Sequence, residues 1–92
     1  MLYMTRMDVA FPPHLSAAQI ADFQAREKEY SGNLQREGTI VGIWRIVGEY
    51  ANHCLFDVPD NDTLHEVLSG FPMFPYMKIK VTPLAKHPNS IS

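Results

Sequence analysis

The stretch SAAQIADFQAREKEYSGNLQREG, residues Ser16–Gly38, decides the fold, because its apolar residues recur with the period of an α-helix. Ser16 is a favourable N-cap, and Gln19 stands three residues later, which completes an S-x-x-Q capping box. Gly38 is a residue type that commonly ends helices. We therefore expect one amphipathic helix between these signals.

The apolar side of this predicted helix contains an acid. On a wheel of about 100° per residue, Glu27 falls in the same sector as Ile20, Phe23, Tyr30 and Leu34. A carboxylate in such surroundings is poorly hydrated, so we expect its pKa to rise and the group to take and return protons. The alternative is that Glu27 reaches water at the edge of the stripe, or pairs with an arginine for structural reasons.

Composition limits the classes of function. The chain has 92 residues, 46% of them hydrophobic, which suits one globular domain that would gain from a partner subunit. The net charge of −2 gives no electrostatic case for binding nucleic acid. A single cysteine, Cys54, excludes an intrachain disulfide and favours a reducing compartment. We find no signal peptide and no membrane-spanning run, and expect a cytoplasmic protein without a membrane partner.

The segments around the helix alternate in polarity and are separated by turn residues. They predict a first strand, a hairpin of two strands, a short helix and a last strand, at Leu2–Val9, Thr39–Val47, Tyr50–Val58, Thr63–Ser69 and Tyr76–Val81. The order β-α-β-β-α-β predicts an α+β, ferredoxin-like domain over residues 1–92, with an antiparallel sheet and both helices on one face. The polar end of the chain, from about residue 83 to 92, reads as a C-terminal arm.

One face of the predicted sheet needs a cover. The residues that we expect in central strands are apolar on both sides of the sheet, as shown by Val41, Trp44, Ile46 and Leu55. A second copy of the chain would bury such a face, so we expect a homo-oligomer larger than a dimer.

Arg45 lies in an apolar strand, where its charge requires an anion. One interpretation is a clamp for a substrate carboxylate, which the planar guanidinium suits. The other is a structural ion pair with Glu27 or Asp57.

Polar side chains at the start of the third strand offer hydrogen bonds. Tyr50 and Asn52 could donate to a carbonyl that becomes an oxyanion, or they could simply contact solvent at the end of a hairpin. The histidines have irregular spacings, and one cysteine does not complete a zinc ligand set, so no metal site is expected among His14, His53, Cys54, His65 and His87.

Short motifs along the whole chain, in their order and spacing, resemble the muconolactone Δ-isomerase family of the β-ketoadipate route. The resemblance is carried by Met1-Leu2-Tyr3, Glu27-Lys28, Leu34-Gln35, Ile43-Trp44-Arg45, Tyr50-Ala51-Asn52, Phe56-Asp57-Val58, Leu64-His65-Glu66, Phe74-Pro75-Tyr76 and His87-Pro88. It implies a ferredoxin-like fold, a ring-like homodecamer with C-terminal arms on neighbouring chains, and no metal or organic cofactor.

The resemblance also implies a reaction. A base removes the C4 proton of a small unsaturated lactone, a dienolate forms, and a proton returns at C2, which moves the C=C bond. Glu27 suits the base, a cation is needed for the substrate's carboxymethyl group, and a donor is needed for the oxyanion. The expected site residues are Glu27, Tyr50 and Asn52 for catalysis, and Lys28, Trp44, Arg45 and His53 for substrate binding.

Some positions depart from the family pattern, namely His53, Cys54 and Ile40–Gly42. If they line the pocket, the substrate would shift to a methyl- or chloro-substituted lactone, with isomerase or dehalogenase activity on the same scaffold. A different class is a non-catalytic, oligomeric binding module, which would tolerate Glu27→Gln.

Overall fold

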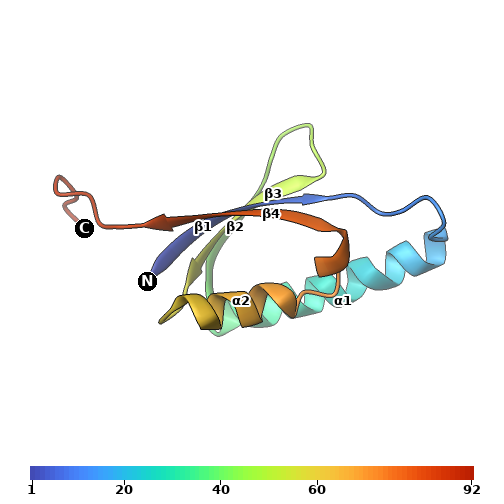
Figure 1. The fold of residues 1–92 in the computed structure, drawn as a ribbon, viewed down its shortest axis with the longest axis horizontal. Helices are drawn as coiled ribbons and strands as arrows, with labels where there is room; N and C mark the ends of the chain where they lie inside the picture. The colour runs from blue at the N-terminus through green and yellow to red at the C-terminus, as the bar shows by residue number, and fades with distance from the viewer.

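A four-stranded antiparallel sheet with two helices on one of its faces makes up the structure (Figure 1). The computed structural model describes residues 1–92. Its elements are β1 (Leu2–Val9), α1 (Ala17–Arg36), β2 (Ile40–Arg45), β3 (Ala51–Asp57), α2 (Asn61–Ser69), the 3₁₀ turn η1 (Phe74–Tyr76) and β4 (Met77–Leu84). The strand order β2-β3-β1-β4 confirms the predicted ferredoxin-like α+β fold. Neither helix is long and apolar enough to cross a membrane.

The predicted capping box starts α1. The Ser16 hydroxyl accepts a hydrogen bond from the Gln19 N–H at 3.1 Å, and the Gln19 side chain accepts one from the Ser16 N–H at 2.8 Å. After the helix, Gly38 adopts a φ of 81°, a left-handed conformation that glycine reaches without strain. Both ends predicted from the sequence are therefore confirmed.

Gly70, the residue that follows α2, lies against Tyr30 of α1. Asp60 caps α2 by accepting a hydrogen bond from the Thr63 N–H at 2.8 Å, and Gly70 follows the last turn. A Cβ atom at Gly70 would collide with the hydroxyl of Tyr30, which donates to the Val67 carbonyl at 2.7 Å. The close approach fixes α2 against α1.

The last strand is longer than predicted. Pro83 and Leu84 still pair with Tyr3 and Leu2 of β1, so β4 takes two residues from the predicted arm. Pro83 is tolerated because β4 is an edge strand. Beyond it the chain runs away from the body (Figure 1). A second correction concerns β2, which is an edge strand and not a central one.

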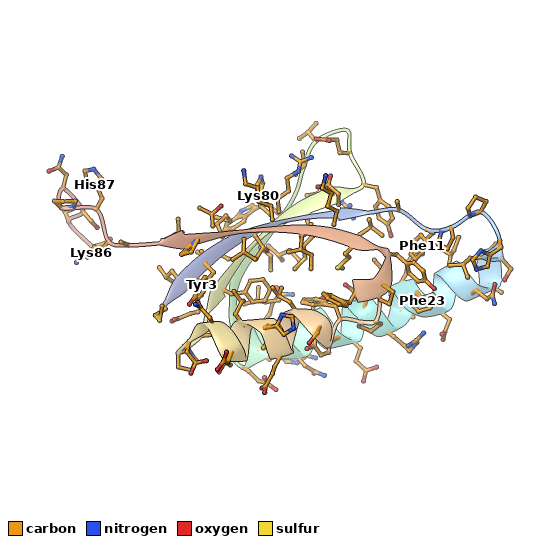
Figure 2. All side chains as sticks on the ribbon, viewed as in Figure 1. Tyr3, Phe11, Phe23, Lys80, Lys86 and His87 are labelled. Atoms are coloured by element: carbon orange, nitrogen blue, oxygen red, sulfur yellow. The ribbon has the colours of Figure 1, made fainter.

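The two faces of the sheet differ in cover. The inner face holds the core under the helices, including Tyr3, Met7 and Phe56, which are all at most 2% exposed. The outer face carries Lys80, which points away from the helices in Figure 2, and Trp44, which is 54% exposed. Within one chain nothing covers the outer face.

Candidate active site

A cavity of about 370 Å³ opens between α1, the inner face of the sheet and the loop after α2. Its lining combines polar side chains of α1 and the β2–β3 hairpin with an apolar wall from the sheet and the loop. The lining residues are Met7, Val9, Gln24, Glu27, Lys28, Ser31, Ile43, Arg45, Tyr50, Asn52, Cys54, Phe71, Met73 and Met77.

Glu27 is the only acidic residue in this lining. Burial raises the pKa of its carboxyl group, and a hydrogen bond from the backbone N–H of Met73 opposes the shift in part. That bond reaches one carboxylate oxygen, Oε1, at 3.0 Å. Glu27 forms no ion pair, so its place in the apolar stripe is not explained by a structural arginine partner. The expected rise in pKa is confirmed in direction.

Two cations lie at the same cavity. Lys28 follows Glu27 on α1, and Arg45 reaches the cavity from the end of β2. Neither is in an ion pair, so the alternative of a bridge from Arg45 to Glu27 or Asp57 is not found. The Arg45 guanidinium instead lies 5.2 Å from the centre of the Tyr50 ring. With one acid and two free cations, the lining carries a net positive charge that suits an anionic ligand.

Asn52 lines the cavity and carries an unpaired polar atom. Its Oδ1 is buried and has no hydrogen-bond partner in the protein. Buried polar atoms are normally satisfied, so this unpaired acceptor in a cavity-lining residue leaves room for a ligand or water that donates a hydrogen bond. A carboxamide offers both an acceptor and two donors, and Asn52 pairs across the strands with Arg45, which brings both to one place.

Tyr50 is held at the mouth of the cavity by its neighbours. Its ring packs against Phe11 with centroids 6.2 Å apart, and its hydroxyl oxygen accepts a hydrogen bond from Gln24 Nε2 at 3.1 Å. Gln24 was not singled out in the sequence, because the wheel places it outside the apolar stripe. Its partner is 26 residues away, which helical periodicity does not show.

The apolar wall contains Cys54, which is fully buried. Burial raises the pKa of its thiol to about 12, so the group is neutral at physiological pH. Together with Met7, Met73 and Met77 it gives the wall a soft, sulfur-rich surface. No group of three or more His, Cys, Asp or Glu side chains is placed to hold a metal ion.

Two predicted substrate-binding residues are not brought to this cavity. Trp44 and His53 pair with each other across β2 and β3 on the outer face, and neither lines the cavity. The His53 Nδ1 atom lies 3.3 Å from the Thr5 carbonyl oxygen. Successive strand residues point to opposite faces, so Trp44 is separated from Arg45 and His53 from Asn52.

A β-bulge in β2 decides whether Trp44 or Arg45 faces the cavity. Ile40 pairs with Phe56 and Ile43 pairs with Cys54, because the register shifts between Ile40 and Gly42. Unbroken alternation from Ile40 would turn Trp44 inward and Arg45 outward. The absence of a side chain at Gly42 also leaves room for the Trp44 ring, whose Cζ2 would lie 2.9 Å from a Cβ there.

The site thus combines a poorly hydrated carboxylate, two cations and the polar side chains of Tyr50 and Asn52 against an apolar wall. Within a ferredoxin-like fold, this arrangement defines a candidate acid–base site for a small anionic substrate. It can hold a carboxylate, exchange protons with carbon and hydrogen-bond a developing oxyanion.

Comparison with known proteins agrees with this class. Residues 1–90 match the family model described as muconolactone delta-isomerase. The chain is 59% identical to muconolactone Delta-isomerase of Cupriavidus pinatubonensis, over 99% of both chains. It is 52% identical to muconolactone Delta-isomerase 1 of Acinetobacter lwoffii, over 99% of this chain and 95% of the relative.

A solved structure supports the same assignment. The crystal structure of a muconolactone isomerase superposes with a TM-score of 0.95 at 46% identity, covering 100% of this chain and 96% of that one. The chain therefore belongs to the muconolactone Δ-isomerase family, and it is an enzyme of the isomerase class.

Proposed function

We propose that the chain converts muconolactone to 3-oxoadipate enol-lactone, in the catechol branch of the β-ketoadipate pathway. The observation that supports this most directly is Glu27, a carboxylate with a raised pKa inside a cavity that also carries two free cations. The relatives described above carry the name of this activity, which does not favour the substituted-lactone or non-catalytic alternatives.

Glu27 acts as the base at both carbons in this proposal. Its ionised carboxylate takes the C4 proton, and the electron pair of that C–H bond moves into the ring. The C=C bond shifts and the lactone carbonyl becomes a dienolate oxygen. The protonated Glu27 then returns the proton to C2. Poor hydration makes the carboxylate a stronger base, and a stronger base is better suited to take a proton from carbon.

Lys28 and Arg45 hold the carboxymethyl group of the substrate, and Asn52 and Tyr50 hydrogen-bond the dienolate oxygen. Arg45 and Asn52 are cross-strand neighbours, and Tyr50 lies on the same hairpin, so these groups converge on one ligand. Donors placed where charge develops stabilise the transition state more than the ground state. The sulfur-rich wall packs against the ring.

We further propose that the functional unit is a homo-oligomer, with a decamer as the expected size. The support is the uncovered outer face with its exposed Trp44, and the exposed arm from residue 85 to 92, which has no contacts that would hold it on its own chain.

The test of the function is a spectrophotometric assay of the purified protein with muconolactone. We expect conversion without any added metal or organic cofactor. Failure to convert muconolactone, together with turnover of a methyl- or chloro-substituted lactone, would move the assignment to the substituted substrate. Failure with every lactone would favour the binding module.

A further inference from the structure

We propose that Gln24 is a positioning residue that directs the hydroxyl hydrogen of Tyr50 into the cavity. The inference rests on the proposed function and concerns a residue to which neither the sequence nor the family assignment gives a role. Its basis is the direction of one hydrogen bond, in which Gln24 Nε2 donates and the Tyr50 oxygen accepts at 3.1 Å.

Two neighbours flank the ring of Tyr50, which is 43% exposed. One side packs near Phe11, whose centroid is 6.2 Å away, and the Arg45 guanidinium lies 5.2 Å from the ring centre. Phe11 belongs to an aromatic cluster with Phe23 and Tyr76, with centroid distances of 5.3 to 6.3 Å. With the ring in this position, the direction of the hydroxyl hydrogen is set by rotation about the C–O bond.

Gln24 removes part of that freedom. A phenol has one hydrogen to donate and lone pairs that accept. Because the amide of Gln24 occupies an accepting position, the hydrogen is not used in that bond and is free for a ligand. Both residues line the cavity, so the hydroxyl hydrogen can be offered to a ligand bound there. Tyr50 can then donate to the dienolate, as the proposed mechanism requires.

Substitutions at position 24 can keep, remove or reverse the direction of this hydrogen bond, which tests the inference at a single position. Gln24 is exposed on α1, so substitutions there should preserve the fold. Gln24→Lys keeps a donor for the Tyr50 oxygen, Gln24→Leu removes the bond, and Gln24→Glu supplies an acceptor that takes the phenolic hydrogen away from the cavity. A bridge that served only to join α1 to the hairpin would survive in Gln24→Glu, since a carboxylate and a phenol also bond well.

The experiment measures kcat and KM with muconolactone for the three variants, each with and without Tyr50→Phe. We expect kcat to fall in the order Lys, Leu, Glu, with Gln24→Leu losing about three- to tenfold, as for one ordinary hydrogen bond. In the Tyr50→Phe background, Gln24→Leu and Gln24→Glu should cause no further loss of kcat, because Gln24 acts through the missing hydroxyl.

Two results would overturn the inference. One is a kcat for Gln24→Glu at or above that of Gln24→Lys. The other is an undiminished loss in the Tyr50→Phe background, which would show that the effect comes from cavity charge rather than from the phenol. If the unmodified protein does not convert muconolactone at all, the proposed function fails and this inference with it. Turnover by the unmodified protein with the wrong order of variants overturns the inference alone.

Discussion

Glu27 on α1 accepts a hydrogen bond from the backbone N–H of Met73, which is 46 residues further along the chain. The bond joins the proposed base to the loop between α2 and β4. This loop contains Pro72 and Pro75, whose fixed φ angles limit its motion. One carboxylate oxygen is thus held in place, and the other has no hydrogen-bond partner in the protein that would compete for a substrate proton.

The raised pKa of Glu27 has a consequence for stability. A carboxyl group whose pKa is higher in the folded than in the unfolded state contributes stability below the unfolded pKa, about 4.5, and loses it as pH rises through the folded pKa. Glu27→Gln cannot lose this contribution, and its amide oxygen can still accept from Met73. We therefore expect Glu27→Gln to melt at a higher temperature than the unmodified protein near pH 8, and the difference to disappear near pH 4.

Thermal melts between pH 4 and pH 8 test the sign of this difference in melting temperature. The difference should be at most a few degrees, since about 1 kcal/mol moves the Tm of a domain of this size by about 4–8 °C and Glu27 is only half-buried. Glu29→Gln, on the exposed side of the same helix, is the matched control. A pH-independent difference for Glu27→Gln would show that removal of the buried charge is not its cause.

The free cations should act on the substrate's carboxylate. We expect Arg45→Leu or Lys28→Met to lower kcat/KM for muconolactone by roughly 10–10²-fold, the cost of one charged hydrogen bond. The methyl ester of the substrate should lose much less, because it has no charge to bind. Arg36→Leu is the control, since Arg36 is an exposed cation at the end of α1 that does not line the cavity. Equal losses for acid and ester would remove the substituted residue from carboxylate binding.

Asn52 should act on the developing oxyanion. Because its carboxamide lines the cavity and its Nδ2 group can donate to the dienolate oxygen, Asn52→Leu should lower kcat by roughly 10²-fold, with a smaller effect on KM. His53→Ala is an informative comparison, because His53 is the next residue and lies on the outer face. If His53→Ala lowers kcat as much as Asn52→Leu, the outer face takes part in the site and the single-chain cavity is incomplete.

The outer face should be an interface between copies of the chain. We expect light scattering at micromolar concentration to give a mass larger than that of a dimer, because Trp44 and the neighbouring apolar side chains need cover. Trp44→Glu places a charge there and should reduce the mass. Val47→Glu, at an exposed turn residue, is the control. A stable monomer of the unmodified protein would contradict the expectation.

The sequence predicted the fold well because its signals are local and agree with one another. The capping box at Ser16, the helical period through Glu27 and Leu34, and the alternation in Leu2–Val9 each fix one element, and their order leaves few topologies. The end of β4 was missed because Pro83 suggests a break, and only its edge position makes it tolerable.

The site was predicted in part. Glu27, Lys28, Arg45, Tyr50 and Asn52 all line the cavity. Trp44 and His53 were expected from the resemblance to the family, and period-2 alternation along each strand separates them from Arg45 and Asn52. Which member of the pair Trp44-Arg45 faces inward depends on the bulge after Ile40, and no residue in the sequence marks that bulge unambiguously. The place of Gln24 in the site was not predicted, because its contact with Tyr50 joins two segments that are distant in the sequence.

The most direct test of the proposed chemistry is the turnover number of Glu27→Gln with muconolactone. The substitution keeps the shape and removes the proton acceptor, so we expect kcat to fall by roughly 10²-fold or more while the protein stays folded. Asp57→Asn is the comparison, because Asp57 is exposed and pairs with the N-terminal ammonium at 3.2 Å, away from the cavity. In the unmodified protein kcat should also decline as acid protonates Glu27. Near-normal turnover by Glu27→Gln, with a loss in Asp57→Asn, would contradict the assignment of Glu27 as the base.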